Sequence, residues 1–308
     1  MICGFSQIYR YAMSTLPMFP SHYYEPWQRF STPIVRQLAF AIASPNLIQY
    51  FPHQLHAAKS IDVHSCLLWQ QYFTAYLPRL IFLDQHPQEL LNFLTKIKST
   101  RLGLRFEALL WFWLQDQENQ YFELLGHSIQ HHANGKTLGE MDFLLRNQQT
   151  QHIEHWEVCL KYYLAAPTLE LGTWIGLNPE DTLLHKLSHL LDQQFQFDTA
   201  LNHCIEKRYA VIKGQFYLPV THAPIPDWLN PQRRLGIWCA HFPKTGRWRH
   251  LSRQEWLCPF PCHSDISSNP IWWTNGLYYN QSTEQFLMLR LLPNSFIYHP
   301  CYTPNILE

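Results

Sequence analysis

Four side chains near the middle of the chain have types and spacing suited to chemistry: Glu140, Asp142, Glu157 and Lys161. Side chains alternate between the two faces of a strand, so Glu140 and Asp142 share one face, and Glu157 and Lys161 share another. If the two strands pair, carboxylates come to lie beside one ammonium group. Carboxylates that hold a magnesium ion next to a cation are the chemistry of a metal-dependent phosphodiesterase.

The segments that carry these residues predict a β-hairpin. Residues 139–145 and 155–164 are short apolar runs, and a polar, glutamine-rich stretch at 146–151 separates them. Two such runs joined by a polar turn are typical of antiparallel strands. Acid–lysine pairs across strands are often only surface ion pairs. Acids within strands that are otherwise apolar are expected to be buried, however, and a buried carboxylate needs a metal ion or a partner.

The composition is that of a globular protein. The 308 residues suffice for one large domain or two smaller ones, and 15 % of them are aromatic. The formal net charge is +0, so binding of a nucleic acid would need a local basic patch. The 8 cysteines are scattered, Arg10 and Tyr11 lie where a signal peptide would need its apolar run, and no run approaches about 18 apolar residues. We therefore expect free thiols, a cytoplasmic location and no membrane span.

The hydrophobic patterning predicts an α/β protein. Helical spacing is found at residues 33–48 (ended by Ser44-Pro45), 65–77, 86–97, 101–114 and 179–195. Asn178 and Pro179 suit the start of the last of these helices. Residues 121–129 predict a strand, residues 206–219 a strand pair around Gly214, and the tail from His222 short strands and loops. The central order is therefore helix, three strands, helix, strand.

That order and its residues resemble known families. The resemblance lies in residues 35–45, 101–109, 138–144, 155–164 and 181–194. The chain resembles a family of uncharacterised bacterial proteins classed as a domain of unknown function. The central order resembles the PD-(D/E)XK nuclease superfamily, whose αβββαβ core places an Asp, a Glu and a Lys around a metal ion.

The resemblance implies a division of the chain. We expect a nuclease-like core at 96–220, a helical region at 21–95 and a Trp- and Pro-rich β region at 221–308 that packs on the core. Residues 1–20 lack clear periodicity and are expected to be a disordered lead, or an over-extended start ahead of Met13 or Met18.

The resemblance also implies a role for each candidate residue. Asp142 and Glu157 bind Mg²⁺ or Mn²⁺, and a backbone carbonyl, water and a substrate phosphate complete the coordination. Lys161 orients the attacking hydroxide or neutralises the developing charge. Glu107, which projects from the first helix of the core, holds a metal-bound water or a second ion. Glu140 contacts the metal ligands rather than the metal ion itself.

One position departs from the superfamily pattern. The usual lysine lies two residues after the glutamate, where this chain has Cys159. Lys161 is on the same strand face about 7 Å further along, and its long stem can reach back. Lys161 is therefore the expected catalytic lysine. In the helix that follows, Lys186 or Gln194 could support the site, but a solvated helix face is the favoured interpretation.

A second candidate region lies between residues 233 and 253. Its basic residues have no acid among them, and Trp238 and Trp248 interleave with the charges. The mixture suits a groove that tracks phosphates and stacks bases, and it equally suits the core of a small sheet with a basic rim. The basic residues are Arg233, Arg234, Lys244, Arg247, Arg249 and Arg253.

The sequence thus favours a metal-dependent nuclease, or a protein derived from one, that acts on DNA or RNA. The competing class is a non-catalytic nucleic-acid-binding or interaction protein that keeps the fold. A third option is a zinc-stabilised structural protein, in which Cys258, Cys262 and His263 join His241 or His250, although a second cysteine pair is missing.

Overall fold

The structure is a computed structural model that describes residues 23–290, apart from residues 98, 134, 241–242, 244–246, 259–274 and 281. Several sequence-based expectations lie outside the described residues. They are the lead at 1–20, the basic Lys244, and the zinc candidates His241, Cys262 and His263.

Helices dominate the first part of the described chain and strands the remainder. The helices are η1 (Pro26–Arg29), α2 (Pro33–Ala43), α3 (Cys66–Gln85), α4 (Gln88–Thr95), α5 (Leu102–Gln115), η2 (Leu171–Thr173), α6 (Leu183–His189), the π-helical turn η3 (Leu190–Gln194) and η4 (Arg253–Trp256). The strands are β1 (Phe122–Ala133), β2 (Lys136–Asn147), β3 (Ile153–Leu164), β4 (Thr199–Ala200), β5 (His203–Cys204), β6 (Lys207–Leu218), β7 (Gly236–Cys239), β8 (Trp248–His250), β9 (Gly276–Asn280) and β10 (Gln285–Leu289).

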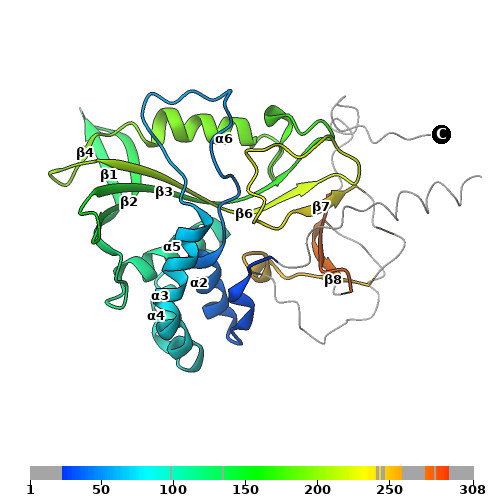
Figure 1. The fold of residues 1–308 in the computed structure, drawn as a ribbon, viewed down its shortest axis with the longest axis horizontal. Helices are drawn as coiled ribbons and strands as arrows, with labels where there is room; N and C mark the ends of the chain where they lie inside the picture. The colour runs from blue at the N-terminus through cyan, green and yellow to red at the C-terminus, as the bar shows by residue number, and fades with distance from the viewer. Residues whose placement is uncertain are drawn as a thin grey trace, which may run out of the picture.

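A mixed sheet of eight strands forms the centre of the described fold, in the order β1-β2-β3-β6-β7-β10-β9-β8. Strands β1, β2 and β3 are antiparallel neighbours, whereas β6 runs parallel to β3 after the α6 crossover. Strands β7 to β10 extend the same sheet beyond β6, and β4 and β5 form a small separate pair. Figure 1 shows α2–α5 on one face of the sheet and α6 on the other. Among the described residues, no helix is long and apolar enough to cross a membrane.

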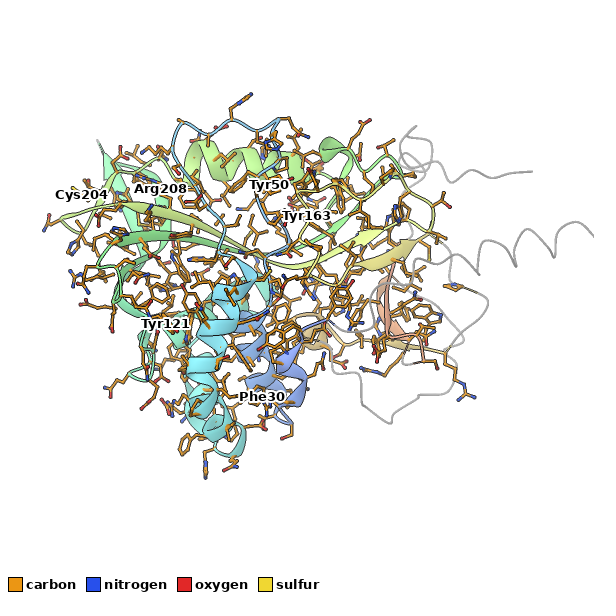
Figure 2. The ribbon with its side chains drawn as sticks, viewed as in Figure 1. Phe30, Tyr50, Tyr121, Tyr163, Cys204 and Arg208 are labelled. Carbon is orange, nitrogen blue, oxygen red and sulfur yellow. The ribbon has the colours of Figure 1, made fainter. Side chains whose placement is uncertain are left out.

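The predicted core order is present as α5, β1, β2, β3, α6 and β6. Successive side chains of β3 point to opposite faces of the sheet, so the strand contributes to two cores. Trp156, Leu160 and Tyr162 pack into the main core with α2, α3 and α5, whereas Tyr163 belongs to a second core with α6. Figure 2 shows side chains on both faces of the sheet. Helix α2 is buried along almost its whole length, as expected for a helix that is apolar all round.

The prediction for residues 206–219 was wrong in one respect, because β6 is one continuous strand and not a strand pair. Gly214 pairs with Lys161 in an unbroken parallel ladder and has φ +122°. A Cβ atom at this position would lie 1.9 Å from the carbonyl oxygen of Lys161. The glycine therefore permits a close approach of two strands and does not make a turn.

The predicted start of the last core helix was also wrong. Helix α6 begins at Leu183, and the Thr182 side chain caps it by accepting the N–H of His185 at 3.2 Å. Asp181 lies in the preceding turn, where its carboxylate binds the side chains of Lys161 and Tyr163. These contacts hold residues 178–181 outside the helix. Helix α3, by contrast, extends past the predicted end at 77 and includes Pro78.

Candidate functional site

The strands β2 and β3 separate at the candidate site. Their ladder includes the pair Phe143 and Trp156 and does not continue to Asp142 and Glu157. The carboxylate of Asp142 accepts the backbone N–H of Val158 at 2.8 Å, and the backbone N–H of Asp142 donates to Oε1 of Glu157 at 3.4 Å. Side chains thus replace the next rung of the ladder. The structure brings the two predicted metal ligands together at this fork.

Glu157 is held from both sides. Its side chain is 1 % exposed. The Nε2 atom of His155 lies 2.7 Å from Oε1, and the side-chain amide of Gln194 donates to Oε2 at 2.5 Å. His155 is fully buried, and its Nδ1 atom has no hydrogen-bond partner among the described residues. These contacts fix the carboxyl group of Glu157 in one orientation toward the fork.

The two carboxyl groups are in an environment that disfavours negative charge. Burial, followed by the charge of Glu157, raises the pKa of Asp142 well above its usual range. Burial raises the pKa of Glu157 to about 8. Burial also lowers the pKa of His155 to about 3, so this imidazole is neutral and leaves Glu157 without a counterion there. A cation at the fork would remove this electrostatic penalty.

Glu107 reaches the same region from α5. Its charge also raises the pKa of Asp142 and of Glu157. The Nε2 atom of His127 on β1 lies 2.9 Å from the Glu107 carboxylate. The His127 ring stacks on the ring of Trp111 with 4.3 Å between the centroids, so α5 contacts this imidazole through both Glu107 and Trp111.

The other two predicted residues have hydrogen-bond partners other than Asp142 and Glu157. Glu140 is exposed and accepts a hydrogen bond from the hydroxyl of Ser128. Lys161 donates to Asp181 at 2.6 Å, so its ammonium group is directed to the turn before α6. Cys159, at the position of the usual lysine, is half-buried, and burial raises the pKa of its thiol.

Helix α6 and its π turn contribute two residues to the site. Lys186 donates to the side-chain oxygen of Gln194 at 2.7 Å, and Gln194 in turn contacts Glu157. His185, His189 and Asp192 are exposed, as a solvated helix face requires. The interpretation as a solvated helix face therefore holds for these three residues and not for Lys186 and Gln194.

Sequence reasoning missed His155 and His127. His155 lies two residues before Glu157, on the same strand face, and that spacing is a signal that could have been used. No local pattern marks His127, because its partner Glu107 lies in a different element.

Most of the described basic residues of the 233–253 segment are engaged within the protein. Arg234 donates to both carboxylate oxygens of Glu25, at 3.1 Å and 3.0 Å, and buried Arg233 lies 3.6 Å from the same group. Arg249 pairs with Glu255 at 2.6 Å, and Arg253 lies over the ring of Trp256. Arg247 is exposed. A nucleic-acid groove along this segment stays a prediction.

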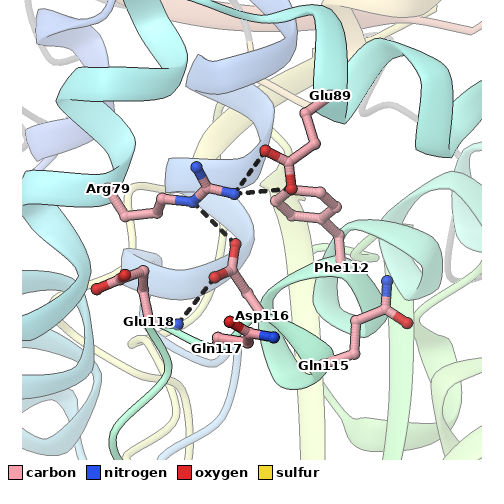
Figure 3. Close-up of a pocket in the computed structure, with 7 residues that line it drawn as sticks. All are labelled: Arg79, Glu89, Phe112, Gln115, Asp116, Gln117 and Glu118. Atoms are coloured by element: carbon pink, nitrogen blue, oxygen red, sulfur yellow. Dashed lines mark hydrogen bonds and ion pairs between the residues drawn. The ribbon is translucent and has the colours of Figure 1, made fainter.

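A cavity of about 490 Å³ lies elsewhere, between α3, α4 and the end of α5 (Figure 3). Arg79 donates to both oxygens of Glu89, at 2.8 Å and 2.7 Å, and to Asp116 at 3.0 Å. Asp116 also accepts the Tyr76 hydroxyl at 2.7 Å. These charges satisfy one another, so we interpret the group as a clamp between three helices.

The donor set at the fork can be compared with the needs of a metal ion. Within the described ranges, no group of three or more His, Cys, Asp or Glu side chains is arranged to hold a metal. Mg²⁺ is commonly bound through only one or two carboxylates, with waters and substrate phosphates as the remaining ligands. Asp142 and Glu157 supply that number, and burial raises the pKa of both, although the charge of Lys186 favours their ionised forms. The residues present therefore fit a divalent cation.

The fold and the fork define a mixed α/β protein with a pair of converging carboxyl groups on two central strands. The chain belongs to the DUF1853 family, described as a domain of unknown function, whose model matches residues 36–295. Comparison with curated proteins and with solved structures found no match.

Proposed function

We propose that this protein is a metal-dependent nuclease that hydrolyses phosphodiester bonds of DNA or RNA at the fork between β2 and β3. One observation carries the proposal: Asp142 and Glu157 converge, and burial raises the pKa of both. A divalent cation stabilises the ionised forms of buried carboxyls, which burial otherwise disfavours. The order α5, β1, β2, β3, α6 and β6 agrees with the αβββαβ core of the PD-(D/E)XK superfamily and supports the same interpretation.

Asp142 and Glu157 would hold Mg²⁺ or Mn²⁺. When bound, the ion would polarise a phosphoryl oxygen and lower the pKa of a bound water. His155 and Gln194 keep the Glu157 carboxyl in place, and the N–H of Val158 does the same for Asp142. Glu107, which contacts His127, would orient a water molecule beside these carboxyls.

The alternative is a non-catalytic protein that binds a nucleic acid or another partner with a degenerate nuclease fold. One observation favours it: each oxygen of Glu157 already accepts or shares a hydrogen bond inside the protein. Such a protein would bind Mn²⁺ weakly and would tolerate loss of Asp142.

Cleavage of single- and double-stranded DNA and RNA, with Mn²⁺ or Mg²⁺, tests the proposal. Wild type is compared with Glu157→Gln, which keeps the shape of the side chain, and with Glu118→Gln, which changes an exposed acid in the turn after α5. The proposal predicts metal-dependent cutting by wild type and Glu118→Gln, and none by Glu157→Gln. No cutting of any substrate by wild type, or equal cutting by all three, would overturn it.

A further inference from the structure

We propose that Lys186 and Gln194 together position the carboxyl group of Glu157 for catalysis, and that Lys161 serves only to anchor the turn before α6. The inference rests on the proposed function and assigns the lysine of that same site. The sequence spacing favours Lys161, but the contacts of the two lysines differ.

Lys161 is committed to a structural contact. Its ammonium group lies 2.6 Å from a carboxylate oxygen of Asp181, and the other oxygen accepts the Tyr163 hydroxyl at 2.8 Å. Asp181 is directly followed by Thr182, the cap of α6. Lys161 and Tyr163 therefore connect β3 to the start of the helix. The pair is partly exposed, and the lysine is bound to Asp181 and not to Asp142 or Glu157.

Lys186 is connected to Glu157 through one amide group. The Lys186 ammonium donates to Oε1 of Gln194 at 2.7 Å, and Nε2 of Gln194 donates to Oε2 of Glu157 at 2.5 Å. An ammonium group can only donate, so the oxygen of the amide must face Lys186 and its NH₂ must face Glu157. The order of donors and acceptors along this chain is thereby fixed.

The π turn explains how Gln194 reaches this place. An α-helix rotates by about 100° per residue, so the residue seven positions after Lys186 would share its face, and the eighth would be turned away by about 80°. The seventh residue is Gln193, which is exposed. The π-helical turn Leu190–Gln194 takes up one extra residue, and Gln194 occupies the inward position. Such π turns occur frequently at functional sites.

The charges support the same assignment. Lys186 favours the ionised forms of Asp142, Glu157 and Cys159, whereas Lys161 acts on Cys159 alone among these three. Lys186 thus partly offsets the burial of the two carboxyls. Its position in a different element also explains why the usual lysine position can be Cys159.

The test compares lysine variants in the Mn²⁺-dependent cleavage assay, with kcat and KM measured separately. We expect Lys186→Met and Gln194→Leu to lower kcat by about 10- to 100-fold with little change in KM, as loss of a ligand-orienting group does. We expect Lys186→Arg to recover part of the loss. Lys161→Met should keep a kcat close to wild type, as should Lys207→Met, an exposed control. If Lys161→Met fails to fold, Lys161→Gln retains a donor for Asp181 and replaces it.

A rescue variant sharpens the test. Cys159 lies on the same face as Glu157, so Cys159→Lys introduces an ammonium group directly beside the fork. Combined with Lys186→Met, it should restore part of kcat. A kcat loss in Lys161→Met as large as in Lys186→Met, or an unchanged Lys186→Met enzyme, would overturn this inference and leave the nuclease proposal standing. A wild type that cuts no substrate would overturn both.

Discussion

The backbone N–H of Asp142 lies 3.4 Å from the side chain of Glu157, and the residue after Glu157 donates its own N–H to the carboxylate of Asp142 at 2.8 Å. The two acids are therefore joined through the backbones of both strands. This reciprocal arrangement replaces one rung of the β2–β3 ladder. It holds two carboxyl groups together although burial and their mutual repulsion oppose their ionisation.

Because ionised carboxyls are disfavoured here, we expect the free energy of unfolding of the metal-free protein to depend on pH. Burial raises the pKa of Glu157 from 4.5 to about 8. A raised carboxyl pKa means that the stabilising contribution is complete below 4.5 and is lost as pH rises through about 8. In EDTA, wild type should lose on the order of 3 kcal/mol relative to Glu157→Gln between about pH 6 and pH 9. Urea unfolding of both proteins measures this difference, and parallel curves would speak against a buried, protonated Glu157.

Gly214 provides a test of the strand geometry. Its φ of +122° and the 1.9 Å approach to the Lys161 carbonyl leave no room for a side chain. We expect Gly214→Ala to lower the free energy of unfolding by about 3 kcal/mol or more. The matched control is Gly103→Ala on α5, where nothing lies within 4 Å and a gain of roughly 0.5 to 1 kcal/mol is expected. Equal effects at both positions would show that β6 is not continuous at Gly214.

Lys213 is fully buried, lies 3.5 Å from the centre of the Trp69 ring and donates to the carbonyl of Ser44. Burial lowers the pKa of Lys213 well below 10.5. Because the unfolded chain then binds more protons than the folded protein, the free energy of unfolding rises as the pH rises toward 10.5. We expect Lys213→Met to remove this pH dependence and to raise the unfolding free energy at pH 7 by about 1 to 3 kcal/mol. Urea unfolding at two pH values tests this. A less stable variant would mean that the contact with Ser44 outweighs the cost of burying the amine.

His127 is expected to act through Glu107. In His127→Phe the stacking on Trp111 is retained, but the 2.9 Å contact with the Glu107 carboxylate is lost. We expect metal-dependent cleavage to fall by about 10-fold while the thermal unfolding temperature changes little. His56→Phe, at an exposed loop position, is the control. An active His127→Phe protein would exclude a role for this pair in the reaction.

The sequence predicted the parts that depend on local periodicity. The β2–β3 hairpin, helix α5 and the convergence of Asp142 with Glu157 follow from apolar runs and the alternation of side chains. The parts that it missed depend on contacts between distant residues. The side chain of Lys161 donates to Asp181, and that of Arg234 donates to Glu25. The π turn leaves no trace in the pattern, because one extra residue shifts the face of Gln194 without breaking the helix.

Calorimetric titration of the metal-free protein with Mn²⁺ tests most directly whether Asp142 and Glu157 hold a metal ion. Wild type is compared with Asp142→Asn, which keeps the size of the side chain. Because Glu157 must lose its proton to bind the ion, the titration is best carried out near pH 8, close to the raised pKa of this carboxyl. We expect saturable binding by wild type and its loss in Asp142→Asn. Absence of binding by wild type, or binding of equal strength by both proteins, would contradict it.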